Sequence, residues 1–341
     1  MLRHVLLAGA LVLSASHLTA QNSAAPATAT GDAVARIAAT HTLVCGIDQS
    51  EAEYTLDEDH GPRVAFDQQM CRAVAVAIAG VDAKVEFKGY PDEETALADL
   101  RAGEIDLVPS VTINVSHRAD ATLELTQTVL IDGVGLLVPT KTHITTAKEL
   151  SGRKVCFLAE TEHEAVLQTA FAARGINLLP YPFQEEGEME AAYSSGNCVA
   201  IGADRTRLAA IRVSFGEDAK DHLLLPDHFD DEPMAMATRA TDAHLRRIAD
   251  SVLAVLLSGE EVRTTEPHVD SLLRQRLSGK TLELGHPLGL RATWAAEVLA
   301  TVGDYGEIYE RTLGSDSPMQ LPRGINRLCS QGGALCATQL K

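Results

Sequence analysis

Two spacings of hydrophobic positions alternate along the chain and together predict an α/β fold. Residues 41–48 are typical of a buried strand, and residues 66–79 carry apolar side chains at the spacing of a helix that ends at a glycine. Residues 83–90 alternate as a strand does, and residues 93–103 are typical of another helix with a glycine at its end. Because a third strand is expected at 105–113, the order strand–helix–strand–helix–strand indicates a largely parallel sheet.

The alternation restarts after residue 140, which indicates a second α/β unit. Its expected elements are a short helix and strand at 146–159, helices at 162–175 and 187–196, and strands at 176–183, 197–204 and 222–229. A long amphipathic helix at 242–257 follows. The two units predict two lobes, lobe 1 from residues 38–132 and 234–341 and lobe 2 from residues 133–233.

The chain would cross between these lobes twice, near residues 128–138 and 230–240. Two crossings suggest a ligand cleft between the lobes, and ligands in open α/β sheets bind beyond the carboxyl ends of the strands. We therefore expect the site to include the residues after Gly46, the residues after Ser110 and the segment 159–162.

The first residues are typical of a secretory signal. Arg3 and His4 precede a short apolar run, and small residues lead to a cleavage point at Ala20. The apolar run is too short for a membrane anchor, which needs about 20 residues. We expect residues 1–20 to be removed on export to the periplasm and residues 21–37 to form a flexible lead-in.

Charge and residue content narrow the class of function. A net charge of −18 argues against nucleic-acid partners, because an acidic surface repels phosphates. The 12 histidines show no His-Glu-x-x-His spacing and the 6 cysteines no Cys-x-x-Cys spacing, so we expect neither a metal site nor a cofactor. Cysteines in an exported chain pair by default, but their spacing alone leaves the connectivity open.

Several segments resemble the general L-amino-acid-binding periplasmic proteins of ABC transporters. They are GRKVC, IDLV, AFDQQMCRAVAVAI and the tail VGDYGEIYERTLGSDSPMQLPRGINRL. These proteins belong to the polar amino-acid group of type II ("Venus flytrap") solute-binding proteins, and the resemblance covers residues 38–335. It implies two Rossmann-like α/β lobes with mixed, mainly parallel sheets, joined by a two-segment hinge, with the C-terminal segment returning to the first lobe.

The resemblance also implies how a free amino acid would be held. Arg118 matches the arginine that clamps the ligand carboxylate, and Asp204 matches the aspartate that holds the ammonium. One anchor on each lobe would favour closure, since only the closed state satisfies both charges. Tyr54 stands where an aromatic residue covers the ligand, and Thr161 stands where a helix start offers backbone N–H groups.

The matched positions depart from the family pattern in several places. Val111 and Ile113 flank Thr112 where relatives carry small hydroxyl residues along the carboxylate pocket. The usual Gly-Thr-Thr of the second lobe reads Glu160-Thr161-Glu162, and Ala65 replaces a glycine. These changes indicate either an acidic pocket or a site that has drifted.

Acidic residues are expected to gather at the cleft. Asp48 matches a position that contacts cationic side chains in binders of basic amino acids, and Glu51 and Glu93 replace aromatic or neutral contacts. With Glu162, these acids would repel a ligand carboxylate, so the site should favour a cationic or polar L-amino acid over an acidic one. Alternatively, they only add to the general acidity of the chain.

The resemblance implies three disulfides, each within one part of the chain. The expected pairs are Cys45–Cys71 in lobe 1, Cys156–Cys198 in lobe 2 and Cys329–Cys336 in the tail. On the chain-entropy model, each of the first two would stabilise its lobe by roughly 3 kcal/mol.

The function favoured by these patterns is the capture of L-amino acids for an ABC importer. The expected partners are the amino acid and a membrane permease, and we expect a monomer that is not an enzyme. Two alternatives stay open: a non-transporting accessory or sensor protein on the same scaffold, and a dehydratase-like enzyme. The enzyme would need an acid or base such as Glu160, Glu162 or His117, whose spacing is not specific.

Overall fold

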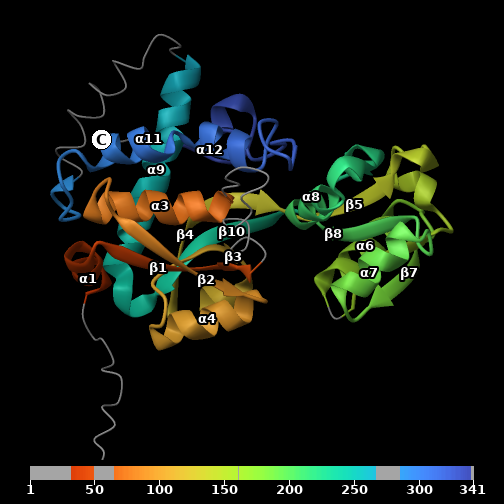
Figure 1. The fold of residues 1–341 in the computed structure, drawn as a ribbon, viewed down its shortest axis with the longest axis horizontal. Helices are drawn as coiled ribbons and strands as arrows, with labels where there is room; N and C mark the ends of the chain where they lie inside the picture. The colour runs from red at the N-terminus through yellow and green to blue at the C-terminus, as the bar shows by residue number, and fades with distance from the viewer. Residues whose placement is uncertain (1–31, 50–64, 160, 266–284, 339–341) are drawn as a thin grey trace, which may run out of the picture. The chain divides into compact units, whose positions relative to one another are not determined.

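Figure 1 traces the helices and strands along the chain, coloured from red near the N-terminus to blue near the C-terminus. The computed structural model describes residues 32–49, 65–159, 161–265 and 285–338. The expected signal segment 1–20 therefore lies outside the described residues. In the part of the chain that is described, no helix combines the length and the apolar character that crossing a bilayer requires.

Helices and strands alternate through most of the described chain, as an α/β fold requires. The strands are β1 (Thr42–Asp48), β2 (Lys84–Tyr90), β3 (Val108–Thr112), β4 (Leu123–Asp132), β5 (Val134–Pro139), β6 (Lys154–Leu158), β7 (Leu179–Phe183), β8 (Ala200–Asp204), β9 (His222–Leu224) and β10 (Glu232–Arg239). The α-helices are α1 (Ala33–Thr40), α3 (Phe66–Ala79), α4 (Glu93–Ala102), α5 (Val115–Ala119), α6 (Glu162–Ala173), α7 (Glu186–Ser194), α8 (Arg205–Ser214), α9 (Ala243–Thr265), α11 (Trp294–Val302) and α12 (Tyr305–Thr312).

Helix α4 shows how local sequence sets the boundaries that the pattern predicts. Its N-cap is Asp92, whose carboxylate accepts a hydrogen bond from Thr95 N at 2.8 Å. It ends at Gly103, which takes the left-handed conformation with φ 83° that a side chain would disfavour. Two acidic residues, Glu93 and Glu94, occupy its first turn, where the helix dipole stabilises negative charge.

The first group of strands brings the ends of β1 and β3 together. β1 and β2 pair in parallel, whereas β10 lies between β3 and β4 and is antiparallel to both. A backbone hydrogen bond from Gly46 N to Leu107 O joins β1 to the start of β3, and the two run parallel. Their carboxyl ends, which carry Asp48 and Thr112, therefore meet at one edge.

Helices α3, α9, α11 and α12 contribute to one apolar core with these strands (Figure 1). Phe66 and Tyr305 pack edge to face with ring centroids 5.9 Å apart, and Trp294 is fully buried beside them in the same core. Leu328 and Leu335 of the tail are buried in this core as well. The expected return of the C-terminal segment to the first part of the chain is thus confirmed.

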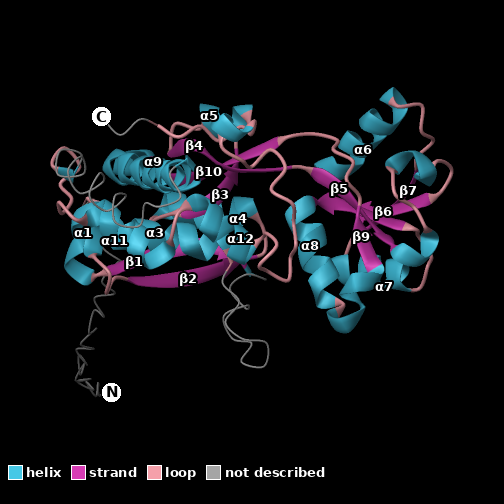
Figure 2. Ribbon diagram, turned by 90° about the horizontal axis from the view of Figure 1, so that it is seen from above, coloured by secondary structure: helices cyan, strands magenta, loops and turns pink. Residues whose placement is uncertain are grey.

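The second group is a five-stranded sheet in the order β7–β6–β8–β5–β9, shown in Figure 2 with α6 and α7 beside it. β6 pairs in parallel with β7 and β8, and β5 pairs antiparallel with β8 and β9. Leu136 and Val138 belong to one apolar cluster and Leu137 to another. Because neighbouring strand residues point to opposite faces, the sheet has a packed core on each side.

The chain passes between the two groups of strands at Gly133 and again just before β10. Gly133 has φ 143°, and a Cβ there would lie 2.4 Å from Asp230 O, so only glycine lets these two segments lie side by side. Val134 N donates to Asp230 Oδ1 at 2.7 Å across the same contact. The two crossings are therefore held to each other by a hydrogen bond from the backbone of one to the Asp230 carboxylate of the other.

Two sequence-based expectations about the fold are corrected. The paired strands are not mainly parallel, because β5 and β10 return through the middle of their sheets in the antiparallel sense. The end of the expected lead-in, residues 33–37, belongs to α1. Asp32 caps that helix at Val34 N, and Ile37 is fully buried, so apolar packing orders the segment.

The three disulfides join the predicted partners. Cys45–Cys71 connects β1 to α3, and Cys156–Cys198 connects β6 to the segment before β8. Cys329–Cys336 closes the small loop in the tail. Each bond therefore lies within one group of strands or in the tail, as expected.

Candidate functional site

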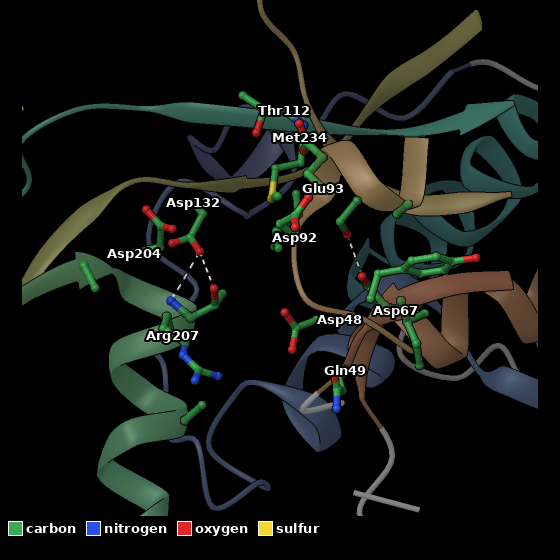
Figure 3. Close-up of a pocket in the computed structure, with 18 of the residues that line it drawn as sticks. Asp48, Gln49, Asp67, Asp92, Glu93, Thr112, Asp132, Asp204, Arg207 and Met234 are labelled. Carbon is green, nitrogen blue, oxygen red and sulfur yellow. Dashed lines mark hydrogen bonds between the residues drawn. The ribbon is translucent and has the colours of Figure 1, made fainter. Parts of the chain in front are cut away.

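A cavity of about 790 Å³ lies where the strand ends of both groups meet (Figure 3). Its walls come from the ends of β1, β3 and β8, the starts of α3, α4 and α8, and the two crossings. The volume falls within the roughly 300–1,000 Å³ of small-molecule sites. The site therefore lies beyond the carboxyl ends of strands, where the sequence analysis expected it.

Carboxylates dominate the polar lining of this cavity. We name the acids on the β1, α3 and α4 side the acidic wall: Asp48, Asp67, Asp92 and Glu93. We name the residues on the β8 side the paired wall: His163, Glu186, Asp204 and Arg207. We name the two acids at the chain crossings the crossing acids: Asp132 and Glu232.

The acidic wall is held largely by neutral donors. Asp67 accepts a hydrogen bond from the hydroxyl of Ser110, and Glu93 Oε2 accepts one from Thr112 N at 2.7 Å. Burial raises the pKa of Asp67 to about 6, against the opposing Ser110 bond and with help from the charge of Asp48. Burial also raises the pKa of Glu93. Because both carboxylates are desolvated, their ionised forms are less stable here than in water.

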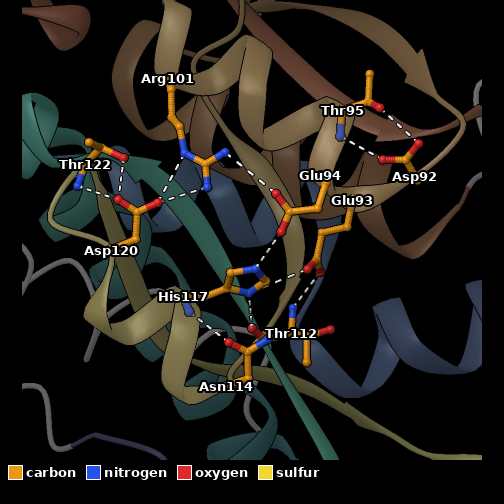
Figure 4. A network of polar contacts seen from close by, with 10 residues as sticks. All are labelled: Asp92, Glu93, Glu94, Thr95, Arg101, Thr112, Asn114, His117, Asp120 and Thr122. Atoms are coloured by element: carbon orange, nitrogen blue, oxygen red, sulfur yellow. Dashed lines mark hydrogen bonds and ion pairs between the residues drawn. The ribbon is translucent and has the colours of Figure 1, made fainter. Parts of the chain in front are cut away.

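A network behind the acidic wall fixes Glu93 in place (Figure 4). Glu93 Oε1 lies 3.5 Å from His117 Nδ1, which also contacts Thr112 O at 2.8 Å. His117 Nε2 lies 3.2 Å from Glu94 Oε1. Burial lowers the pKa of His117, but the Thr112 carbonyl and the two glutamates outweigh it and raise the pKa overall. The imidazole thus positions Glu93 without itself lining the cavity.

On the paired wall, each cation already contacts a carboxylate. Arg207 Nε donates to Glu186 Oε1 at 2.6 Å, and its Nη2 contacts Glu186 Oε2. His163 Nε2 lies 3.1 Å from Asp204 Oδ1. Burial lowers the pKa of His163, yet the hydrogen bond and charge of Asp204 raise it overall. The paired wall is therefore close to charge balance.

The crossing acids add further carboxylates to the lining of the cavity. Asp132 is buried and accepts hydrogen bonds from the backbone N and the hydroxyl of Thr206. Burial, and next the charge of Asp204, raise the pKa of Asp132 to about 7. Glu232 Oε1 accepts a 2.7 Å hydrogen bond from the hydroxyl of Thr112, and burial raises the pKa of Glu232.

Four of the residues singled out from the sequence line the cavity: Asp48, Glu93, Thr112 and Asp204. Asp204 ends β8 at the start of α8, and its side chain is about a third exposed, at 34%. That placement suits a group that contacts a ligand, because the carboxylate is accessible and precedes a helix. Asp48 ends β1 on the acidic wall.

Arg118 and Thr161 are not brought to the cavity. Arg118 is exposed on α5, whereas the preceding residue, His117, is the buried one. Successive helical residues point about 100° apart, so the inward position here falls on the histidine. Thr161 precedes α6, and its hydroxyl donates to Leu158 O at 2.7 Å. The geometry thus gives no support to a carboxylate clamp at Arg118.

Other predicted site residues cannot be placed. Glu51 and Tyr54 lie outside the described residues, and so does Glu160 of the substituted second-lobe segment. Glu162 begins α6, but only its backbone is described.

Sequence reasoning missed a larger set of lining residues: Asp67, Asp92, Asp132, His163, Glu186, Arg207 and Glu232. A signal existed for some of them. Asp132 and Glu232 fall inside the two segments where the chain was expected to cross, so the acidic residues of these segments were a signal that the sequence analysis did not use. Arg207 and Glu186 had no such signal, because their pairing across α7 and α8 is a tertiary contact.

Comparison with known proteins decides the family. The chain is 32% identical over 332 residues to the Escherichia coli K12 putative amino-acid ABC transporter-binding protein YhdW, covering 95% of this chain and 96% of that protein. The chain belongs to this family of amino-acid ABC transporter periplasmic binding proteins. It is also 30% identical over 330 residues to the general L-amino acid-binding periplasmic protein AapJ of Rhizobium johnstonii, covering 94% of this chain and 95% of AapJ. A search of family models gave no match.

Solved structures agree with this family. An ABC transporter periplasmic binding protein from Brucella ovis with glutathione bound superposes with a TM-score of 0.76 at 29% identity, covering 91% of this chain and all of that one. An ancestral cationic amino acid solute-binding protein matches at a TM-score of 0.52 and 20% identity over 68% of this chain and 95% of that one, a likeness of fold alone. The protein is a periplasmic solute-binding protein with a mixed α/β fold of the type II class, and not an enzyme.

Proposed function

We propose that this protein captures L-amino acids, with a preference for cationic ones, and delivers them to the membrane permease of an ABC importer. The observation that carries the proposal is the cavity of about 790 Å³, whose described lining holds the acidic wall, the crossing acids and Asp204. The names of its relatives support the amino-acid class, since AapJ is a general L-amino acid-binding protein. We propose that the protein acts as a monomer.

The proposal includes two lobes that close on the ligand, residues 38–132 with 234–341 and residues 133–233. In its support, the described strands show the chain passing between the two groups of strands only at Gly133 and before Glu232. Both crossings contribute to the cavity through Asp132 and Glu232, so movement there changes the cavity directly. A ligand that contacts both walls stabilises the closed state by the difference in its affinity for the two states.

Charge sets the preference among amino acids. In the proposed pose, Asp204 accepts the α-ammonium and the acidic wall accepts the guanidinium or ammonium of the side chain. An acidic side chain would face desolvated carboxylates instead, which disfavours binding unless a proton is taken up. Among the described lining residues, Arg207 carries the guanidinium with which a ligand carboxylate would pair. Glu186 already contacts one edge of that guanidinium.

Isothermal titration of the mature protein against the common L-amino acids tests the function. We expect arginine, lysine and ornithine to bind more tightly than glutamate and aspartate at neutral pH, and added salt to weaken the arginine complex. Glutamate binding more tightly than arginine would overturn the preference. Failure of every amino acid to bind a folded preparation would overturn the function itself.

A further inference from the structure

The ligand carboxylate is the part of an amino acid that this cavity accommodates least well. In the described lining, the cationic groups are Arg207 and His163, and each is within hydrogen-bond distance of a carboxylate of the same wall. Arg118, the expected clamp, lies outside the lining. An α-carboxylate would therefore share Arg207 with Glu186 or lie among acids.

The cations of a ligand, in contrast, have acceptors at two separate places. Figure 3 shows Asp132 and Asp204 on one side of the cavity and Asp67 on the other, with Asp48 between them. The charges within each place act on one another: Asp204 raises the pKa of Asp132, and Asp48 raises that of Asp67. Two cationic groups joined by a chain would neutralise both places at once.

The apolar part of the cavity lining suits methylene groups. The apolar lining includes Phe66, Tyr90, Leu130, Met189, Met234 and Leu313. Aromatic and thioether side chains pack well against an alkyl chain, and an aromatic face also attracts a cation. An aliphatic linker would therefore be desolvated while its charged ends meet carboxylates.

We propose that the cavity takes aliphatic diamines and guanidino amines, and that it binds them more tightly than the amino acids from which they differ only by the α-carboxylate. This inference rests on the proposed function, because it assigns the ligand class of the same cavity. The cavity and the family membership locate the binding site. The distribution of charge in the cavity lining indicates the chemical class of the ligand. Solute capture and delivery to a permease remain as proposed.

Two matched ligand pairs test the inference: L-lysine against 1,5-diaminopentane, and L-arginine against agmatine. Within each pair the carboxylate is the only difference. Isothermal titration at pH 7.5 should give dissociation constants at least tenfold lower for the amine of each pair. If lysine and arginine bind as tightly as their amines or more tightly, the inference is overturned and the proposed function stands. If none of the four binds a folded protein, both are overturned.

A variant of the paired wall gives an independent readout. Glu186→Gln removes the carboxylate that contacts Arg207, so the guanidinium becomes more available to a ligand carboxylate. We expect the gap between lysine and 1,5-diaminopentane to shrink at least threefold, mainly through tighter lysine binding. Glu188→Gln, an exposed glutamate on the same helix, is the matched control and should leave the gap unchanged. An equal gap in Glu186→Gln and the control would contradict the role given to Arg207.

Discussion

The two walls of the cavity treat charge in opposite ways. On the paired wall, Arg207 meets Glu186 and His163 meets Asp204, so each cation is balanced before any ligand arrives. On the acidic wall, a hydroxyl group donates to Asp67 and a backbone N–H donates to Glu93, and burial raises the pKa of Asp67 to about 6. The cations of the paired wall already have carboxylate partners, whereas the acidic wall gains most from an incoming cation.

The difference in charge pairing between the two walls indicates which charged group of a ligand each wall binds. A desolvated carboxylate is stabilised by a cation that replaces the lost water, so Asp67 and Glu93 of the acidic wall favour a positively charged ligand group. An ion pair whose charges are already balanced strongly favours neither a cationic nor an anionic ligand group, because the ligand must first break the existing contact. Selectivity for charge should therefore reside on the acidic wall, and the paired wall should adjust the strength of binding.

The largest expected effect concerns the disulfide beneath each wall. Cys45–Cys71 supports the acidic wall through β1 and α3, and Cys156–Cys198 supports the paired wall through β6 and β8. With sequence separations of 26 and 42 residues, the chain-entropy model gives roughly 3–4 kcal/mol for each. We expect Cys45→Ala/Cys71→Ala and Cys156→Ala/Cys198→Ala each to lower the free energy of unfolding in urea by that amount.

Removal of the tail disulfide serves as the control for these variants. Cys329–Cys336 closes a separation of only 7 residues, so Cys329→Ala/Cys336→Ala should destabilise the protein less. Equal losses for all three double variants would show that loop length does not decide the effect.

The second prediction concerns Asp204, which was expected to hold the ligand ammonium and which lines the cavity. Asp204→Asn should weaken arginine binding by about 2 kcal/mol, roughly thirtyfold in Kd, because the ligand ammonium loses the charged carboxylate that we propose as its partner. Asp82→Asn, at an exposed turn between α3 and β2, is the matched control and should leave Kd unchanged. Titration calorimetry that gave equal Kd values for both variants would remove Asp204 from the site.

The third prediction is a pH dependence that arises mainly outside the paired wall. The pKa of Asp67 is raised to about 6 and that of Asp132 to about 7, so both are partly protonated in mildly acidic solution. A bound cation favours the ionised carboxylates, so arginine affinity should rise between pH 5 and 8, by up to about tenfold per pH unit for each proton released.

Calorimetry in buffers of different ionisation enthalpy measures that proton release. Asp67→Asn and Asp132→Asn should each reduce it, and Asp82→Asn should not. Affinity that falls as the pH rises from 5 to 8 would contradict the sign of the linkage.

The smallest expected effect is at Arg118. Because this residue is exposed on α5 and outside the cavity lining, Arg118→Ala should change arginine affinity by less than twofold, below about 0.4 kcal/mol. The measurement also decides between the structure and the family pattern, under which the loss would be about 2–5 kcal/mol.

The sequence predicted the parts of the fold that local chemistry determines. Apolar spacing and a terminal glycine set the bounds of α3 and α4, and strand patterns located β1, with Asp48 at its end. The disulfide partners followed from the family resemblance and are confirmed. Asp204 followed from the family resemblance, and the structure places it at the end of β8, in the lining of the cavity.

The rest depended on tertiary contacts that no local pattern contains. A shift of one residue on α5 exchanges Arg118 for His117 on the inner face, and only the packed helix shows which of the two is buried. The antiparallel returns of β5 and β10 were missed because strand direction in a sheet depends on the path of the chain. Arg207 and Glu186 lie 21 positions apart and meet only after α7 and α8 pack.

A crystal structure of the protein with L-arginine bound would test the central claim most directly, because it locates both ends of the ligand. The account predicts that the guanidinium lies within hydrogen-bond distance of at least one carboxylate of the acidic wall, with the α-ammonium at Asp204. A ligand whose carboxylate pairs with Arg118, or whose guanidinium lies away from the acidic wall, would contradict it.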